Sequence, residues 1–84
     1  MPVLYRFNGI TIEMYPTEHP PPHFHARYNE FIAQIDIKNV LVMHGILPQP
    51  QMRSVKAWAE PRRDLLMAAW VAIREGRKPE KING

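Results

Sequence analysis

Three of the four histidines of this chain lie close together in the segment Glu18-His19-Pro20-Pro21-Pro22-His23-Phe24-His25. Proline fixes its own φ angle and lacks an amide donor, and it drives the residue before it toward extended geometry. The histidines are therefore expected on a stiff, extended backbone. Because imidazole changes charge near neutral pH and is the commonest metal ligand, the segment predicts a working site for metal binding or proton transfer.

The segments on either side of Asn8-Gly9 have the pattern of two β-strands, because apolar residues alternate with polar ones. The Asn-Gly dipeptide strongly favours a two-residue type I′ hairpin between 3–7 and 10–15. In the second strand the period of two places Ile10, Ile12 and Met14 on one face, and Thr11, Glu13 and Tyr15 on the other. We expect only the isoleucines and the methionine to be core.

A second hairpin is predicted from residues 23–28 and 31–38, which flank Asn29-Glu30, and a short strand from 40–43 follows it. If the turn is tight, Tyr28 pairs with Phe31. Counting back along the strands then places Gln34 opposite His25 and Asp36 opposite His23.

Alternation along the strand 23–28 separates its side chains into two sets. Phe24, Ala26 and Tyr28 are expected to face the core. One open face of the sheet would then carry His23, His25, Arg27, Gln34 and Asp36 together.

From Gln51 onward apolar residues recur every three or four positions, which is typical of helices, and Pro61 fits the first turn of a second helix. Trp58 and Trp70 are expected to be packing residues, and Gly76 fits a helix C-terminal cap. The predicted fold class is α+β: an antiparallel sheet of about five short strands, followed by a C-terminal helical hairpin packed on one face. Residues 1–76 would form this single domain and 77–84 a solvated tail.

The cysteine content and the charge of the chain indicate its cellular compartment and its possible partners. The chain has no cysteine, which excludes disulfides and thiolate metal sites and fits the reducing cytoplasm. We expect neither a signal peptide nor a membrane span. Eleven basic residues stand against eight acidic ones, and most of the basic residues follow residue 50. This asymmetry would permit contact with nucleic acid, although a solvated helical face is the favoured interpretation.

The histidines allow three functional interpretations. As a metal site, His23 and His25 would bind a divalent ion together with Asp36 or His19. As an acid/base pair, the same two imidazoles would cleave RNA, with Arg27 stabilising phosphate charge and Asp36 as an orienting group.

The third interpretation is a binding surface, on which these histidines, Arg27 and Tyr15 hold a partner or a nucleic-acid backbone. The competing structural interpretation makes His19 a loop residue, pairs His23 with Asp36, and leaves His25 exposed on its strand.

Further motifs carry a family likeness along nearly the whole chain. They are Met1-Pro2, Arg6-Phe7-Asn8-Gly9-Ile10, Met14-Tyr15, Pro21-Pro22-His23-Phe24-His25-Ala26-Arg27-Tyr28, Ala33-Gln34-Ile35-Asp36-Ile37, Gly45-Ile46-Leu47-Pro48, Trp58-Ala59-Glu60, Trp70 and 76–82. With these motifs the chain resembles the small bacterial domain-of-unknown-function family numbered four-one-six-zero. The Pro-Pro-His-Phe-His segment is the most distinctive element of the likeness.

The resemblance implies a component of a two-gene module of the toxin-antitoxin type, paired with a second small protein. It maps the family motif onto His23 and His25, framed by Pro21, Pro22 and Tyr28. The chain has Arg62 where relatives commonly have a histidine and Pro61 where they more often have leucine, which weakens a multi-histidine catalytic site.

We therefore expect a cytoplasmic protein that recognises a small protein partner or nucleic acid through its histidine-bearing strand face. A metal-dependent or acid/base nuclease-type toxin using the same face is the alternative. Pairing of exposed sheet edges could also produce a homodimer.

Overall fold

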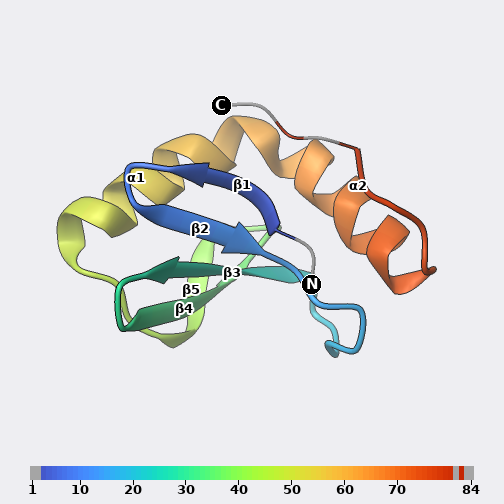
Figure 1. Cartoon of the computed structure of the whole chain (residues 1–84), viewed down its shortest axis with the longest axis horizontal. Coiled ribbons are helices and arrows are strands. Elements are labelled where there is room, and N and C mark those ends of the chain that lie inside the picture. Colours follow the sequence, from blue (N-terminus) through green and yellow to red (C-terminus); the bar gives the residue numbers. More distant parts are fainter. Residues whose placement is uncertain (1–2, 81, 83–84) are drawn as a thin grey trace.

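Five antiparallel strands form one sheet, and helices follow them in the chain (Figure 1). The structure is a computed structural model and describes residues 3–80 and 82. The strands lie side by side in chain order: β1 (Val3–Phe7), β2 (Ile10–Glu13), β3 (His23–Tyr28), β4 (Phe31–Asp36) and β5 (Leu41–Gly45). Next come α1 (Gln49–Ala59), the 3₁₀ turn η1 (Glu60–Arg62) and α2 (Arg63–Arg74). The predicted α+β class and five-stranded sheet are confirmed.

Two tight turns fix the register of the sheet. Asn8 and Gly9 both have positive φ angles, 50° and 76°, as a type I′ turn requires. Across the second hairpin Tyr28 pairs with Phe31, so that His25 lies opposite Gln34 and His23 opposite Asp36. This is the predicted register, and it decides which side of β3 each histidine faces.

The core lies between the sheet and the helices. Ile10, Ile12 and Met14 are fully buried, as predicted, and so are Phe24 and Ala26 on the same face of the sheet. Trp58 of α1 stacks on Tyr5 with ring centroids 5.5 Å apart and an interplanar angle of 3°. Trp58 and Trp70 are each 6% exposed, which confirms that both tryptophans are packing residues.

The helices lie end to end rather than as an antiparallel pair (Figure 1). Pro61 is in η1, just before α2, and not in the first turn of that helix. Ala59 and Arg63, which flank η1, and Glu60 at its start have right-handed helical φ and ψ angles, whereas Arg62 departs from them with φ of −112° and ψ of 17°. The chain therefore bends at this single 3₁₀ turn without reversing. The predicted hairpin is therefore a bent helical arm that spans the sheet.

The C-terminal segment is only partly solvated. Gly76, with φ of 77°, ends α2 in the predicted capping position, and Arg77 N–H donates to the Ala72 carbonyl. The capping turn sends the chain back along α2 (Figure 1). Arg77 and Lys78 are exposed, as expected of a tail, but Ile82 is 1% exposed and packs into the core. Three tail residues, 81 and 83–84, lie outside the described residues, as do 1–2.

Candidate functional site

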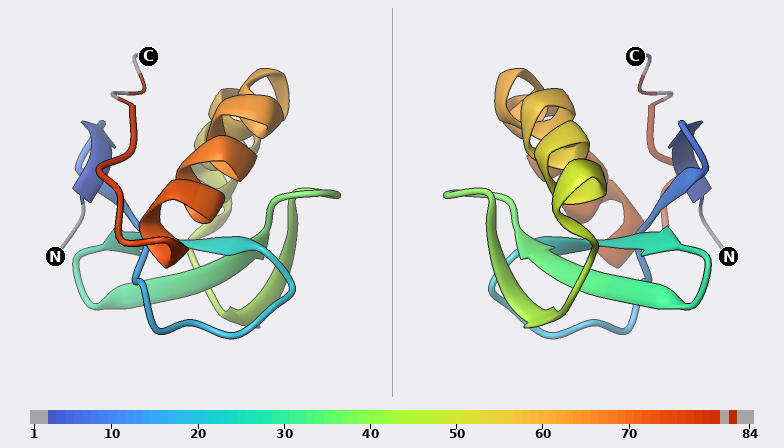
Figure 2. Two further views of the ribbon diagram at one scale, coloured as in Figure 1. Left: turned by 90° about the vertical axis from the view of Figure 1, so that its right-hand side faces the viewer. Right: turned by 90° about the vertical axis from the view of Figure 1, so that its left-hand side faces the viewer.

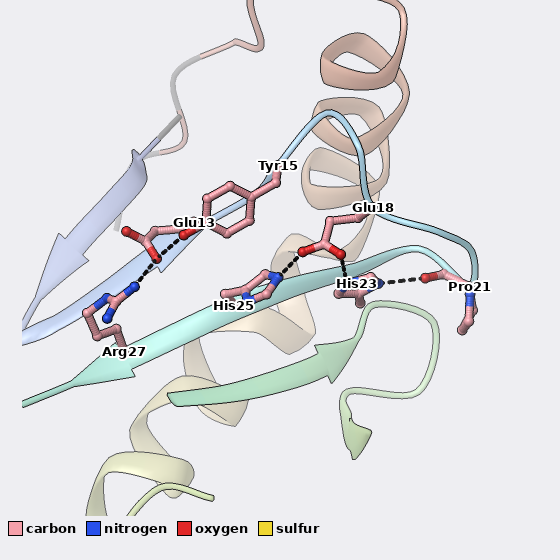
Figure 3. Close-up of polar contacts among 7 residues, drawn as sticks. All are labelled: Glu13, Tyr15, Glu18, Pro21, His23, His25 and Arg27. Carbon is pink, nitrogen blue, oxygen red and sulfur yellow. Dashed lines mark hydrogen bonds and ion pairs between the residues drawn. The ribbon is translucent and has the colours of Figure 1, made fainter. Parts of the chain in front are cut away.

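Glu18, His23 and His25 form a compact group, here called the His/Glu cluster (Figure 3). The two histidines come from β3, and Glu18 comes from residues 14–22, the loop that joins β2 to β3. His25 Nε2 lies 2.5 Å from Glu18 Oε1, and His23 Nε2 lies 3.7 Å from Glu18 Oε2. On its other side, His23 Nδ1 lies 2.8 Å from the Pro21 carbonyl oxygen. The imidazoles thus converge on a single carboxylate.

Burial of the cluster differs from the sequence expectation. The 14–22 loop passes on the side of the sheet away from the helices (Figure 2). The side chains of His23, His25 and Glu18 are 4%, 12% and 27% exposed. The prediction that His23 lies on an open face is wrong, because Glu18 and Trp70 cover it; its ring centroid is 5.1 Å from that of Trp70. The Pro20–Pro21 peptide bond, in the loop before β3, is cis.

Glu13, Tyr15 and Arg27 form a second polar group beside the cluster (Figure 3). The Tyr15 hydroxyl donates to Glu13 Oε1 at 2.9 Å, and Arg27 Nη2 donates to the same oxygen at 3.4 Å. Glu13 is only 4% exposed, so the expectation that its face of β2 lies outside the buried interior is wrong for this residue. The Glu13 carboxylate raises the pKa of Arg27. Burial, and then Glu13, raises the pKa of Tyr15.

The raised pKa of Tyr15 predicts a loss of stability in alkaline solution. Because the folded protein holds the phenolic proton more tightly than the unfolded chain, the stabilisation is complete below the unfolded pKa of 10.0 and is lost as pH rises through the folded value. We expect Tyr15→Phe to remove this part of the pH dependence. Urea unfolding of both proteins on either side of pH 10.0 measures it; parallel pH curves for the two would contradict the prediction.

The other predicted site residues are not part of the cluster. His19 is exposed, and the structure groups Glu18, not His19, with the two histidines. Asp36 lies opposite His23 in the sheet, but its carboxylate accepts a hydrogen bond from the Asn39 amide at 2.8 Å. Sequence reasoning missed Glu18 as a partner, although a carboxylate directly before the His-Pro segment was a usable signal.

The donor set of the cluster suits a divalent metal ion. One ligand atom each from Glu18, His23 and His25 lie within 4.8 Å of one another. Two imidazole nitrogens and a carboxylate oxygen are a common set for zinc and for other first-row metals. The same groups can alternatively exchange protons with each other, because one carboxylate faces both rings.

The face of the sheet opposite the main helix layer, which α2 reaches only through Trp70 at His23 among the residues named here, also exposes large aliphatic side chains; we call it the helix-free face. Ile32 pairs with Arg27 and is 40% exposed; Leu41 pairs with Asp36 and is 55% exposed. Because paired residues share a face, both lie on the side of the histidines.

A separate groove of about 350 Å³ lies beside α2 and contains no residue of the His/Glu cluster.

Comparison with known proteins gives one match. Residues 9–71 match the model of a protein family described as a domain of unknown function, DUF4160, which confirms the resemblance drawn from the sequence motifs. No curated protein and no solved structure matches the chain. No helix in the described part of the chain has the length and apolar character needed to cross a membrane.

Proposed function

This chain belongs to the DUF4160 family of domains of unknown function, and we propose that it is the recognition component of a two-gene module of the toxin-antitoxin type. In this proposal it binds the small protein encoded beside it, in the cytoplasm. The absence of cysteine suits that compartment.

The observation that carries the proposal is the composition of the helix-free face. On this face Ile32, which pairs with Arg27, is 40% exposed, and Leu41, which pairs with Asp36 further along β4, is 55% exposed. The Arg27 side chain is itself 43% exposed. Aliphatic groups next to an arginine and ringed by polar residues are typical of protein interfaces. The 14–22 loop, tied to β3 through Glu18 and His25, would form one border of this surface.

A nuclease-type toxin is the less favoured function. It would require a phosphate group to reach both imidazoles, and the His23 side chain is only 4% exposed. Arg27, the group assigned to phosphate in that mechanism, already pairs with the buried Glu13 carboxylate. Contact between this protein and nucleic acid would then occur through the complex with its partner.

Ile32→Asp and Leu41→Asp test the recognition surface. Each is expected to weaken binding to the product of the adjacent gene by roughly tenfold or more, because a charge replaces a buried apolar contact. Leu65→Asp is the matched control, since Leu65 is 45% exposed on α2, on the other side of the sheet. Isothermal titration calorimetry measures the three affinities, and light scattering of the free protein reports any homodimer.

The proposed surface would be contradicted if all three variants weakened partner binding equally, or if none of them weakened it. The double variant His23→Ala/His25→Ala distinguishes the nuclease function from partner recognition. If the variant still binds the partner but no longer inhibits growth or cleaves RNA, the histidines do chemistry and the nuclease interpretation replaces the recognition proposal.

A further inference from the structure

We propose that Glu18, His23 and His25 bind one divalent metal ion of the zinc class, a site that goes beyond partner recognition. The three side chains offer two imidazole nitrogens and one carboxylate oxygen, all within 4.8 Å of one another. Three protein ligands leave a fourth position for water or for a partner's side chain.

His23 carries the argument through its two ring nitrogens. The Pro21 carbonyl oxygen can only accept a hydrogen bond, so Nδ1, at 2.8 Å from it, holds the proton and donates. In the neutral ring, Nε2 therefore has a free lone pair. This atom is buried and has no hydrogen-bond partner among the residues that the structure describes. A ligand histidine that donates its other N–H to a backbone carbonyl is the usual arrangement at metal sites.

A divalent cation would bridge His23 and Glu18. In the neutral ring, the lone pair of the buried His23 Nε2 faces Oε2 of the partly exposed Glu18 side chain at 3.7 Å, so two acceptor atoms oppose each other. A shared proton does not fit, because this separation exceeds a hydrogen bond. Two atoms bound to one zinc ion at ~2.0–2.2 Å lie roughly 3.4 Å apart in tetrahedral geometry. The observed spacing is close to that value.

The remaining pair must open for the metal. His25 Nε2 and Glu18 Oε1 are 2.5 Å apart, which is a direct hydrogen bond and too short for two ligands of one ion. The proton of this hydrogen bond is released to solvent when the metal binds, because a ligand nitrogen is unprotonated. Glu18 lies on a loop and its side chain is 27% exposed, so its carboxylate can turn while β3 holds both imidazoles. The Tyr15 ring, edge-on to His25 at 4.8 Å, and the Trp70 ring beside His23 keep the imidazole planes in place.

The test is titration of the full chain, stripped with a chelator, with zinc chloride. We expect one zinc ion per chain, and Glu18→Gln and His23→Gln are each expected to weaken zinc binding by roughly 100-fold or more. Metal-site partners outside the direct ligands already cost 10–100-fold. His19→Gln and His44→Gln are matched controls from exposed positions, and both are expected to bind zinc like the unchanged protein.

If a variant fails to fold, cobalt(II) binding to the unchanged protein tests the site without any substitution. The unchanged protein is expected to give the intense visible absorption of four-coordinate cobalt, and zinc is expected to displace it. Absence of zinc binding, or equal loss in the His19 and His44 controls, would overturn the metal site. Because Ile32 and Leu41 are not in the cluster, failure of the metal site leaves the partner-binding result unaffected.

Discussion

Zinc at a hundredfold excess over its dissociation constant is expected to raise the midpoint of thermal unfolding by about 10–20 °C. A ligand that binds only the folded state at that excess stabilises it by about 2.7 kcal/mol. In a domain of this size each kcal/mol shifts the midpoint by about 4–8 °C. The effect should be large here because the ion would join the 14–22 loop to β3 through Glu18, His23 and His25, ligands that the unfolded chain does not hold together.

Differential scanning calorimetry with and without zinc measures this shift. Glu18→Gln is expected to abolish it, because glutamine retains the size of the side chain but loses its charge and one of its two oxygen atoms. His19→Gln, an exposed change in the same loop, is expected to retain it. A midpoint that stays constant or falls as zinc is added to the unchanged protein would show that the ion does not bind the folded state.

Gly45→Ala is expected to destabilise the protein by roughly 3–4 kcal/mol, a large share of the stability of so small a domain. Gly45 ends β5 with φ of 80°, and a Cβ atom there would lie 2.1 Å from the Ile32 carbonyl oxygen. That oxygen belongs to the backbone of β4 and accepts a hydrogen bond from Ile46 N–H, so it cannot move without disturbing the sheet. The substitution therefore combines backbone strain with a steric clash.

Gly76→Ala measures the backbone strain without the steric clash. Gly76 has a similar φ of 77°, but a Cβ atom there would meet nothing within 4 Å. This variant should cost only about 1–2 kcal/mol, the strain of the left-handed conformation. Urea denaturation of both variants gives the comparison. Equal losses of stability would mean that the clash at Ile32 is relieved by a small shift of the strands.

Local signals in the sequence were enough to predict the sheet. Asn8-Gly9 fixes one turn, and Asn29-Glu30 fixes the other, so the pairing of His23 with Asp36 and of His25 with Gln34 follows by counting. The alternation of β3 correctly separates Phe24 from the histidines. These features depend on residues close in the chain, which is why one sequence suffices.

Features that depend on distant contacts were not predicted. The burial of His23 depends on the path of the 14–22 loop and on Trp70, which lies far along the chain. The direction of α2 depends on how η1 bends, and the burial of Ile82 depends on the turn at Gly76. Glu18 was overlooked because strand periodicity assigns faces only within strands, and this residue lies in a loop.

The central claim is that Glu18 and the two imidazoles of β3 form one metal-binding centre, with the Nε2 lone pair of His23 directed at the carboxylate. Long-range ¹H–¹⁵N NMR of the imidazole rings tests it most directly, because the nitrogen shifts distinguish protonated, unprotonated and metal-bound atoms. We predict that His23 carries its proton on Nδ1, and that one equivalent of zinc shifts Nε2 of His23 and His25 but leaves His19 and His44 unchanged. A proton on Nε2 of His23 in the neutral ring, or zinc shifts confined to His19 and His44, would contradict the account.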